Sequence, residues 1–290
     1  MSSTATAAAP REIEPLRSWI GRTETGTDTI TPVPVAALSA TLDRGDPPPR
    51  AGDPLPPLWH WLYFLPLHPA SELGEDGHAK RGGFLPPVTL PRRMWAGGRF
   101  TFHASLHIGE AIRRTSTIVD ITQKQGRSGA LVFVCVRHEI SGAAGLALTE
   151  EQDLVYRAEA GPNEASPAPR PAPENPAWQR RIVPDDVLLF RYSALIFNAH
   201  RIHYDRRYAT EVEKYPGLVV HGPLIATLLL DLLRRNSSAP LASFRFRAVR
   251  PLFDLSPFTV AGRADPLAAA LWAADSEGFL AMDAEARFRA

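Results

Sequence analysis

Two sets of three apolar runs, one in each half of the chain, predict antiparallel sheets. The runs of the first half are RRTSTIVDITQ, ALVFVCVRHEI and LALTEEQDLVYR, and those of the second half are PFTVAGRAD, LAAALWAAD and FLAMDAEARFR. The turn segments QGRSG, SGAAG, ADP and DSEG separate them. Short runs at this spacing are typical of strands joined as a meander, because Gly, Asp and Ser favour tight turns.

The second half also contains a segment that predicts a buried helix, HGPLIATLLLDLLRRN, which starts at His221. Its side chains are apolar on almost every face, and the polar exceptions fall on one stripe, at Thr227, Asp231, Arg234 and Arg235. Such a helix must lie inside a protein to bury its surface. The Gly-Pro pair suits the first turn, where proline lacks only an N–H that no helical bond uses. A buried helix wrapped by an antiparallel sheet is the hot-dog arrangement.

Two pairs of matching segments indicate that the halves are duplicated copies. FTFHA from Phe100 matches FRFRA from Phe244, and ITPVPVAALSATLD from Ile30 matches IVPDDVLLFRYSALI from Ile182. The matches follow the same order in both halves. The first half has no equally clean helix, and VAALSATLD and LWHWLYFLP are the candidates. We therefore predict an α+β double hot-dog fold, two antiparallel sheets each wrapping a central helix, with the N-terminal helix degraded.

A proline-rich segment, GPNEASPAPRPAPENPAW at residues 161–178, predicts the boundary between the copies. Its six prolines favour an extended spacer over helix or sheet. We predict an N-terminal hot dog at residues 1–160 that shapes the substrate pocket, the linker at 161–178, and a catalytic hot dog at 179–290.

Composition excludes several classes of partner. The net charge of +1 makes no electrostatic case for nucleic acid. No apolar run approaches the ~20 residues that span a membrane, and the N-terminus lacks the basic and apolar regions of a secretory signal. Cys135 is the single cysteine, so no internal disulfide can form, and we expect it to be a small core residue. These features favour a cytoplasmic protein without a nucleic-acid or membrane partner.

Titratable side chains gather in NAHRIHYDRRYA, at residues 198–209. Residues of the kind that bind zinc are present at His200, His203, Asp205 and His221. A second pair with firm ligand spacing and an HExxH motif are both absent. Ser193 lies nearby without the GxSxG turn of a hydrolase nucleophile. Acid–base chemistry fits best, because histidine can accept and donate protons near neutral pH.

The sequence around this cluster resembles a known family. SALIFNAHRIHYDRRYATEVEKYPGLVVHGPLIATLLLDLL is similar to the MaoC-like R-specific hydratases and dehydratases. Their usual pattern is Asp-x-Asn-x-x-His-x-Asp, followed by a His-Gly pair that opens the hot-dog helix. The variant FNAHRIHYD with YPGLVVHGPL looks most like the hydroxyacyl-thioester dehydratase type 2 group and the bacterial mesaconyl-C4-CoA and itaconyl-CoA hydratases. LWHWLYFLP and GGFLPPVTLPRRMWAGG extend the resemblance to residues 25–290.

The resemblance implies roles for four positions. His203 matches the catalytic histidine, and Gly222 matches the residue whose N–H faces the thioester carbonyl. Asn198 and His200 stand where the family usually has Asp and Asn. Asparagine cannot accept a proton at neutral pH. We therefore expect His203 to be the main acid–base group and Asn198 to position water or the thioester.

Arginines and aromatic residues are the candidates for substrate binding. Arg191 or Arg201 could bind a carboxylate, because a guanidinium donates two parallel hydrogen bonds. Arg206, Arg207 or Arg250 could bind the phosphates of CoA. The other candidates for the substrate pocket are Tyr192, His200, His221 and Trp95, with Trp59, Trp61, Tyr63 and Phe64 as an aromatic wall.

The resemblance implies a hydro-lyase that adds water to a C5 dicarboxylic enoyl-CoA, mesaconyl-C4-CoA or itaconyl-CoA, to give citramalyl-CoA, as in itaconate degradation. Coenzyme A enters as part of the substrate, and neither a metal nor a redox cofactor is expected. One alternative is a dehydratase for 3-hydroxyacyl chains on acyl carrier protein or CoA. Another is a catalytically silent hot dog that binds acyl-CoA. The fold itself favours a homodimer.

Overall fold

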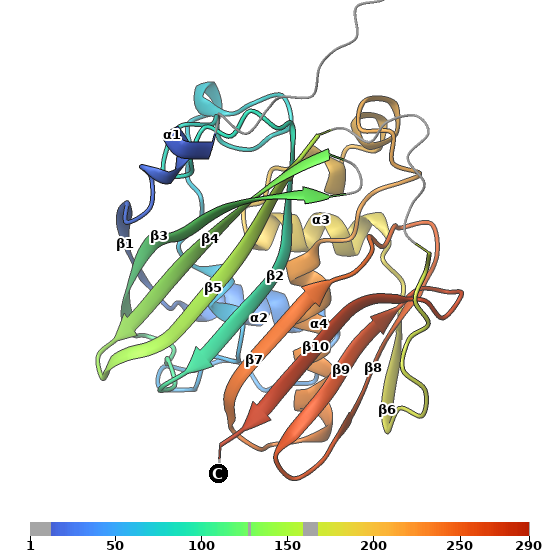
Figure 1. Ribbon diagram of the computed structural model, residues 1–290. Coiled ribbons are helices and arrows are strands. Elements are labelled where there is room, and N and C mark those ends of the chain that lie inside the picture. The colour runs from blue at the N-terminus through green and yellow to red at the C-terminus, as the bar shows by residue number, and fades with distance from the viewer. Residues whose placement is uncertain (1–12, 127–128, 159–167, 290) are drawn as a thin grey trace, which may run out of the picture.

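The two halves join in a single antiparallel sheet of ten strands, in the order β1-β3-β4-β5-β2-β7-β10-β9-β8-β6 (Figure 1). The computed structural model describes residues 13–126, 129–158 and 168–289. The strands of the first half are β1 (Thr23–Thr29), β2 (Arg92–Phe102), β3 (Ala111–Gly126), β4 (Gly129–Gly142) and β5 (Gly145–Arg157). Those of the second half are β6 (Trp178–Ile182), β7 (Leu241–Ala248), β8 (Phe258–Ala264), β9 (Ala268–Ala274) and β10 (Leu280–Phe288).

Four α-helices accompany the sheet in the described part of the chain: α1 (Ile13–Arg17), α2 (Pro32–Thr41), α3 (Asp186–Leu195) and α4 (Gly222–Asn236). A helix long and apolar enough to cross a membrane is absent from these residues. α2 and α3 lie against each other, and α4 runs along the sheet of the second half (Figure 1). Every predicted strand run and the predicted helix at 221–236 are therefore confirmed as elements.

Matching sequences meet at the centre of the sheet. β2 pairs with β7 so that Phe100 lies opposite Phe244 and Gly98 opposite Phe246. Outward from β2 the order is β5, β4, β3 and β1, and outward from β7 it is β10, β9, β8 and β6. Each strand of one half thus has a counterpart in the other half, as a duplication requires. The double hot-dog fold is confirmed, with the two five-stranded sheets joined edge to edge.

Helix α4 is buried because the sheet of the second half wraps it. Its side chains from Leu224 to Leu233 are all buried, and it packs against β6, β8, β9 and β10. The first half of the predicted polar stripe is buried too, since Thr227 is 2% and Asp231 is 1% exposed, whereas Arg234 is half-buried and Arg235 is exposed. Buried polar groups need partners, and Asp231 finds them both on its own helix and on other segments.

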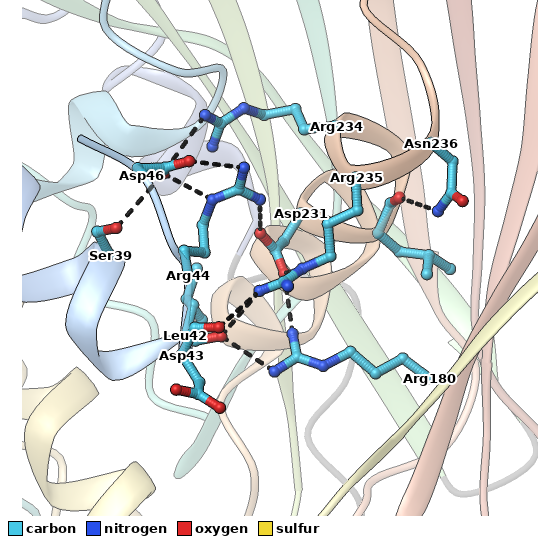
Figure 2. Close-up of polar contacts among 11 residues, drawn as sticks. Ser39, Leu42, Asp43, Arg44, Asp46, Arg180, Asp231, Arg234, Arg235 and Asn236 are labelled. Atoms are coloured by element: carbon cyan, nitrogen blue, oxygen red, sulfur yellow. Dashed lines mark hydrogen bonds and ion pairs between the residues drawn. The ribbon is translucent and has the colours of Figure 1, made fainter.

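An ionic network around Asp231 ties α4 to its surroundings (Figure 2). The Asp231 carboxylate accepts hydrogen bonds from Arg44, which follows α2, from Arg180 of β6 at 2.9 Å, and from Arg235 at 2.8 Å. Arg180 and Arg235 also donate to the carbonyl of Leu42 at 3.0 Å. The network therefore fastens the segment after α2, which belongs to the first half, to the helix of the second half.

A counterpart of α4 is missing from the described residues of the first half. The long connection from α2 to β2 forms only short 3₁₀ turns, Trp59–Leu62 and Ala70–Glu72. Side chains of this connection, including Trp59 and Leu62, enter the same apolar core as α4. The degraded N-terminal helix is thus confirmed, and α2 is the counterpart of α3, as the match between their sequences indicated.

A buried carboxylate holds part of this connection against the sheet. Glu150 of β5 is 2% exposed, and its oxygens lie 2.8 Å from His60 Nε2 and 3.1 Å from Trp61 Nε1, which donates. Burial opposes ionisation of Glu150, but the charge and hydrogen bond of His60 outweigh it and lower its pKa to about 2. The pair fixes the aromatic wall predicted from LWHWLYFLP.

The predicted linker lies partly outside the described residues, which resume at 168. From there the chain runs beside the turn between β9 and β10, where Ala172 N–H donates to Gly278 O at 2.9 Å and Leu280 N–H donates to Arg170 O at 2.8 Å. β6 begins at Trp178, the last residue of the predicted linker. The described part is therefore docked, and the division into two domains stays a prediction.

The single cysteine lies outside the core, contrary to the prediction. Cys135 is half-buried on β4, between the buried Val134 and Val136, so it faces the opposite side of the sheet. Its Sγ lies 3.5 Å from Arg99 Nη2. Burial raises the pKa of the thiol to about 11, with Asp153 adding to the effect. The thiol stays protonated at neutral pH and is a poor nucleophile.

Candidate active site

The 3₁₀ turn Arg201–His203 places His203 beside the start of α4. His203 Nδ1 lies 2.7 Å from the carbonyl O of Val219. A carbonyl can only accept, so Nδ1 carries the ring proton. The ring is 8% exposed, and burial together with repulsion from His78 lowers its pKa to about 4. The imidazole is therefore neutral at pH 7, and Nε2 has a lone pair that can take a proton.

His221 packs against the ring of His203. The two rings are stacked, with centroids 3.7 Å apart. His221 Nε2 lies 2.8 Å from Ser193 Oγ on α3, and burial lowers its pKa well below the ordinary value. The neighbouring Tyr192 has its hydroxyl 3.4 Å from Thr227 Oγ1. His221 and Tyr192 are 0% and 1% exposed, so we correct their predicted role from substrate contact to support of the site.

The start of α4 is open at Gly222. A Cβ at this position would meet no heavy atom within 4 Å. The N–H groups of the first turn have no helical acceptor and carry partial positive charge. Space and positive charge coincide at this point, as the predicted role of Gly222 toward a thioester oxygen requires.

A loop of the first half, at residues 74–78, packs against the backbone of Ala199 and Arg201, just before His203. Gly77 has φ +87°, and a Cβ there would lie 1.8 Å from the carbonyl O of Ala199. Arg201 N–H donates to the carbonyl O of Asp76 at 2.9 Å. His78 Nδ1 lies 2.9 Å from the Asp76 carboxylate. Sequence analysis missed this loop, and the only local signal was an Asp-Gly turn directly before a histidine.

His200 connects this loop to His203. Its ring centroid lies 4.0 Å from that of His78 and 5.4 Å from that of His203. Burial, with repulsion from His78 and His203, lowers the pKa of His200 to about 2. Asn198 Oδ1 accepts the His200 N–H at 3.0 Å, so this side chain caps the turn. Four imidazoles, at positions 78, 200, 203 and 221, thus form one continuous cluster.

The cluster suggests a cation site different from the zinc set considered above. Asp76, His78 and His200 each bring one donor atom within 4.8 Å of the others. The rings of His78 and His200, however, face each other at an interplanar angle of 40°. Two imidazoles that bind one tetrahedral metal point their edges at it. The arrangement is therefore that of two tilted imidazoles in contact, with one carboxylate beside them.

The arginines near the motif already have partners. Arg201 forms an ion pair with Asp205 at 2.7 Å, and its Nη1 donates to the carbonyl O of Glu75 at 3.0 Å. Arg207 pairs with Glu211 at 2.8 Å and Arg250 with Asp275 at 2.9 Å. Arg206 pairs with Asp186 at 2.8 Å and with Asp254. Their predicted roles at a carboxylate or at CoA phosphates would require exchange of these partners.

Arg191 lies in a separate cleft of about 400 Å³ between α3, β6 and the end of α2. Arg180 and Arg181 line the same cleft, whereas the described histidines of the cluster do not. The predicted role of Arg191 at a substrate carboxylate therefore stays a prediction.

Trp95 lies in an aromatic group at the junction of β2 and β7. Its ring centroid is 5.2 Å from that of Trp61 and 5.7 Å from that of Phe246. The indole N–H donates to the carbonyl O of Gly97 at 2.7 Å. Trp95 is half-buried, and its role in the pocket stays a prediction.

The buried histidines make stability dependent on pH. His138 and His203 have pKa values lowered from 6.5 to about 4 by burial. Between these values the unfolded chain binds a proton at each ring and the folded chain does not, so stability falls as pH falls. The expected loss is about 1.4 kcal/mol per pH unit for each ring. Urea midpoints at pH 7.5, 6.0 and 5.0 would measure it, and a midpoint that does not move would contradict it.

A double hot dog whose buried helix starts beside a neutral histidine defines a class, the hydro-lyases with this fold. The hydroxyacyl-thioester dehydratase type 2 family matches residues 58–254. The chain is 53% identical over 249 residues to the mesaconyl-C(4)-CoA hydratase of Chloroflexus aurantiacus, covering 85% of this chain and 88% of that one. The chain therefore belongs to the hydroxyacyl-thioester dehydratase type 2 family.

Two further comparisons agree with this assignment. The mitochondrial hydroxyacyl-thioester dehydratase type 2 of Schizosaccharomyces pombe is 30% identical over 234 residues, which cover 71% of this chain and 77% of that one. A solved MaoC-like dehydratase superposes with a TM-score of 0.71 at 14% identity, covering 94% of this chain and 99% of that one. The structural match supports the fold, and the sequence matches support the family.

Proposed function

We propose that this protein is a hydratase that adds water to the double bond of mesaconyl-C4-CoA, or of itaconyl-CoA, to give citramalyl-CoA. One observation carries the proposal: a neutral His203, with its Nδ1 bonded to Val219, lies at the open start of α4. The relative at 53% identity, a mesaconyl-C(4)-CoA hydratase, supports the choice of substrate.

The site supplies a group for each step of the addition to a conjugated thioester. Nε2 of His203 accepts a proton from water as the water oxygen bonds to Cβ. The N–H groups at Gly222 stabilise the negative charge that moves onto the thioester oxygen. The same proton then passes from His203 to Cα, which restores the carbonyl and the neutral imidazole. Asn198 cannot take a proton, and its Oδ1 fixes the backbone of His200.

The free carboxylate of the substrate needs a cation, and Arg93 is better placed than Arg201. The positive charge of Arg93, on β2, helps to lower the pKa of both His78 and His200. Among the described residues its guanidinium has no ion pair, whereas Arg201 is held by Asp205. We therefore assign the substrate carboxylate to Arg93.

The experiment is to follow loss of enoyl-thioester absorbance with mesaconyl-C4-CoA, itaconyl-CoA and crotonyl-CoA. We expect the diacid thioesters to react and crotonyl-CoA to react poorly. Arg93→Leu is expected to raise KM for the diacid thioesters roughly 10- to 100-fold, since a charged hydrogen-bonded pair is lost, and to leave crotonyl-CoA unchanged. Arg113→Leu, on an exposed position of β3, is the matched control.

Two alternatives give different results in the same assay. Turnover of crotonyl-CoA alone would indicate a fatty-acyl dehydratase, the alternative that the relative from Schizosaccharomyces pombe supports. Binding of all three thioesters without turnover would indicate a silent acyl-CoA-binding protein.

The proposal also covers the setting of the reaction. Hydration transfers no electrons, so the proposed enzyme uses no redox cofactor, and CoA arrives with the substrate. We also propose that no metal is needed, because His203 and the start of α4 supply the proton transfer and the stabilisation of charge. We propose a cytoplasmic homodimer without nucleic-acid or membrane partners. The single cysteine supports a reducing compartment, and the outer strands β1 and β6 leave sheet edges through which hot-dog sheets can pair.

A further inference from the structure

The imidazole cluster contains four buried or half-buried rings and one carboxylate. Among the described residues, Asp76 is the only acidic side chain that forms a hydrogen bond with any of the four rings. Asp205, the other carboxylate of the motif, accepts from Arg201 and from the N–H of Tyr208. Any positive charge that forms on the cluster therefore has Asp76 as its counter-ion.

The position of Asp76 is fixed by the fold. Its carbonyl accepts the N–H of Arg201, and Gly77 lets the loop backbone reach the carbonyl of Ala199. These contacts connect residues more than 120 positions apart and fasten the loop to the turn that carries His203. The carboxylate and the base are thus held on one rigid unit.

The protonation states in this unit follow from its partners. Burial raises the pKa of Asp76, but the hydrogen bond and charge of His78 outweigh this and lower it overall, so the carboxylate is ionised. A carboxylate only accepts, so Nδ1 of His78 carries its proton toward Asp76. The other groups that face His78 are cations or neutral rings: Arg81, Arg93, His200 and His203. Asp76 alone offsets them.

We propose that Asp76, acting through His78 and His200, stabilises the positive charge that His203 acquires when it takes the proton of water. Asp76 is a positioning and charge-compensating residue: it stays ionised, and the proton returns from His203 to Cα. The inference rests on the proposed hydration. It explains how a site with asparagine at position 198 can transfer a proton, because the negative charge comes from the other half of the chain.

The test compares two variants that remove one negative charge each from the same loop. Asp76→Asn keeps the shape of the side chain, and Glu75→Gln changes an exposed neighbour. Asp76→Asn is expected to lower kcat roughly 10- to 100-fold, the size expected for a unit charge roughly 6–12 Å away at an effective dielectric of ~20. KM is expected to stay within twofold of wild type. Glu75→Gln is expected to behave as wild type.

Chemical rescue separates charge from structure. In Asp76→Ala, added formate is expected to raise kcat at least tenfold. Formamide, which has the same size and no charge, is expected to leave kcat unchanged. Equal rescue by both compounds, or by neither, would mean that Asp76 only holds the loop in place, and the proposal would be overturned. An Asp76→Asn enzyme with wild-type kcat would overturn it as well.

A titration without substrate keeps this inference separate from the proposed function. Ring nitrogen shifts of His203, followed by NMR against pH, are expected to show a lower pKa in Asp76→Asn than in wild type or Glu75→Gln. This result would support the inference even if wild type hydrates none of the three thioesters. An unchanged His203 pKa in Asp76→Asn would overturn it, even for an active hydratase.

Discussion

The variant His203→Asn is expected to lose about 1,000-fold in kcat, within the 10²–10⁴ range typical of a general acid–base group. The asparagine amide nitrogen takes the place of Nδ1 and can keep the 2.7 Å hydrogen bond to Val219 O. Nε2 and its lone pair are lost. The substrate still meets Gly222 and the pocket walls, so KM is expected to change little. Single-turnover loss of enoyl absorbance would measure the chemical step directly.

The control for this variant is His68→Asn, because His68 is exposed and lies outside the cluster. Its kcat is expected to equal that of wild type. Urea unfolding of His203→Asn would show that the fold is retained. If the variant keeps more than a tenth of the wild-type kcat, another group takes the proton of water, and the mechanism through His203 is wrong.

The variant Asp231→Leu is expected to lower the free energy of unfolding by about 3–5 kcal/mol, the usual cost of removing one partner from a buried ion pair. The Asp231 side chain is 0% exposed and Arg44 is 11% exposed. Without the carboxylate, Arg44, Arg180 and Arg235 lose their shared acceptor inside the protein. Urea denaturation at pH 7.5, followed by circular dichroism, would give the difference.

Two further variants test whether the effect of Asp231→Leu is specific to the network. Asp43→Asn removes an exposed carboxylate beside the same arginines and is expected to cost less than 1 kcal/mol. Arg44→Leu combined with Asp231→Leu is expected to lower the free energy of unfolding by less than the sum of the two single changes, because each single change already removes the ion pair between these side chains. A double variant as unstable as that sum would show that the two side chains are not coupled.

Much of the fold was predictable because strands and helices produce regular patterns of apolar residues over short stretches of sequence. The strand runs, the helix at 221–236 and the paired FxFxA segments depend on residues close together in the chain. The arrangement of the copies was less predictable: β2 and β7 share a ladder with Phe100 opposite Phe244, so one sheet forms where two were expected. Nothing in either strand records that its partner would be the other copy.

The candidate site was predictable only on the side of the second half. His203 stacks on His221, the residue before Gly222, and its contact with Val219 shows which ring nitrogen carries the proton. The catalytic roles of His203 and Gly222 stay predictions. Asp76 and His78 were missed because Gly77 and Ala199 meet through backbone shape, which has no sequence period. The predicted arginine roles stay predictions, and the partners of these arginines were not visible in the sequence, since the acceptor of Arg206 is Asp254, 48 residues away. Long-range ion pairs cannot be chosen from spacing along the chain.

The network around Asp231 has a consequence for behaviour on heating. The hydration of charged groups becomes less favourable as temperature rises, so the cost of keeping the Asp231 carboxylate and its arginines out of water falls. Hydrophobic stabilisation per unit area levels off over the same range. The share of the stability between the two halves that comes from the contact of the Leu42 segment with α4 therefore grows with temperature. In a warm environment this network would be among the last contacts between the two halves to open.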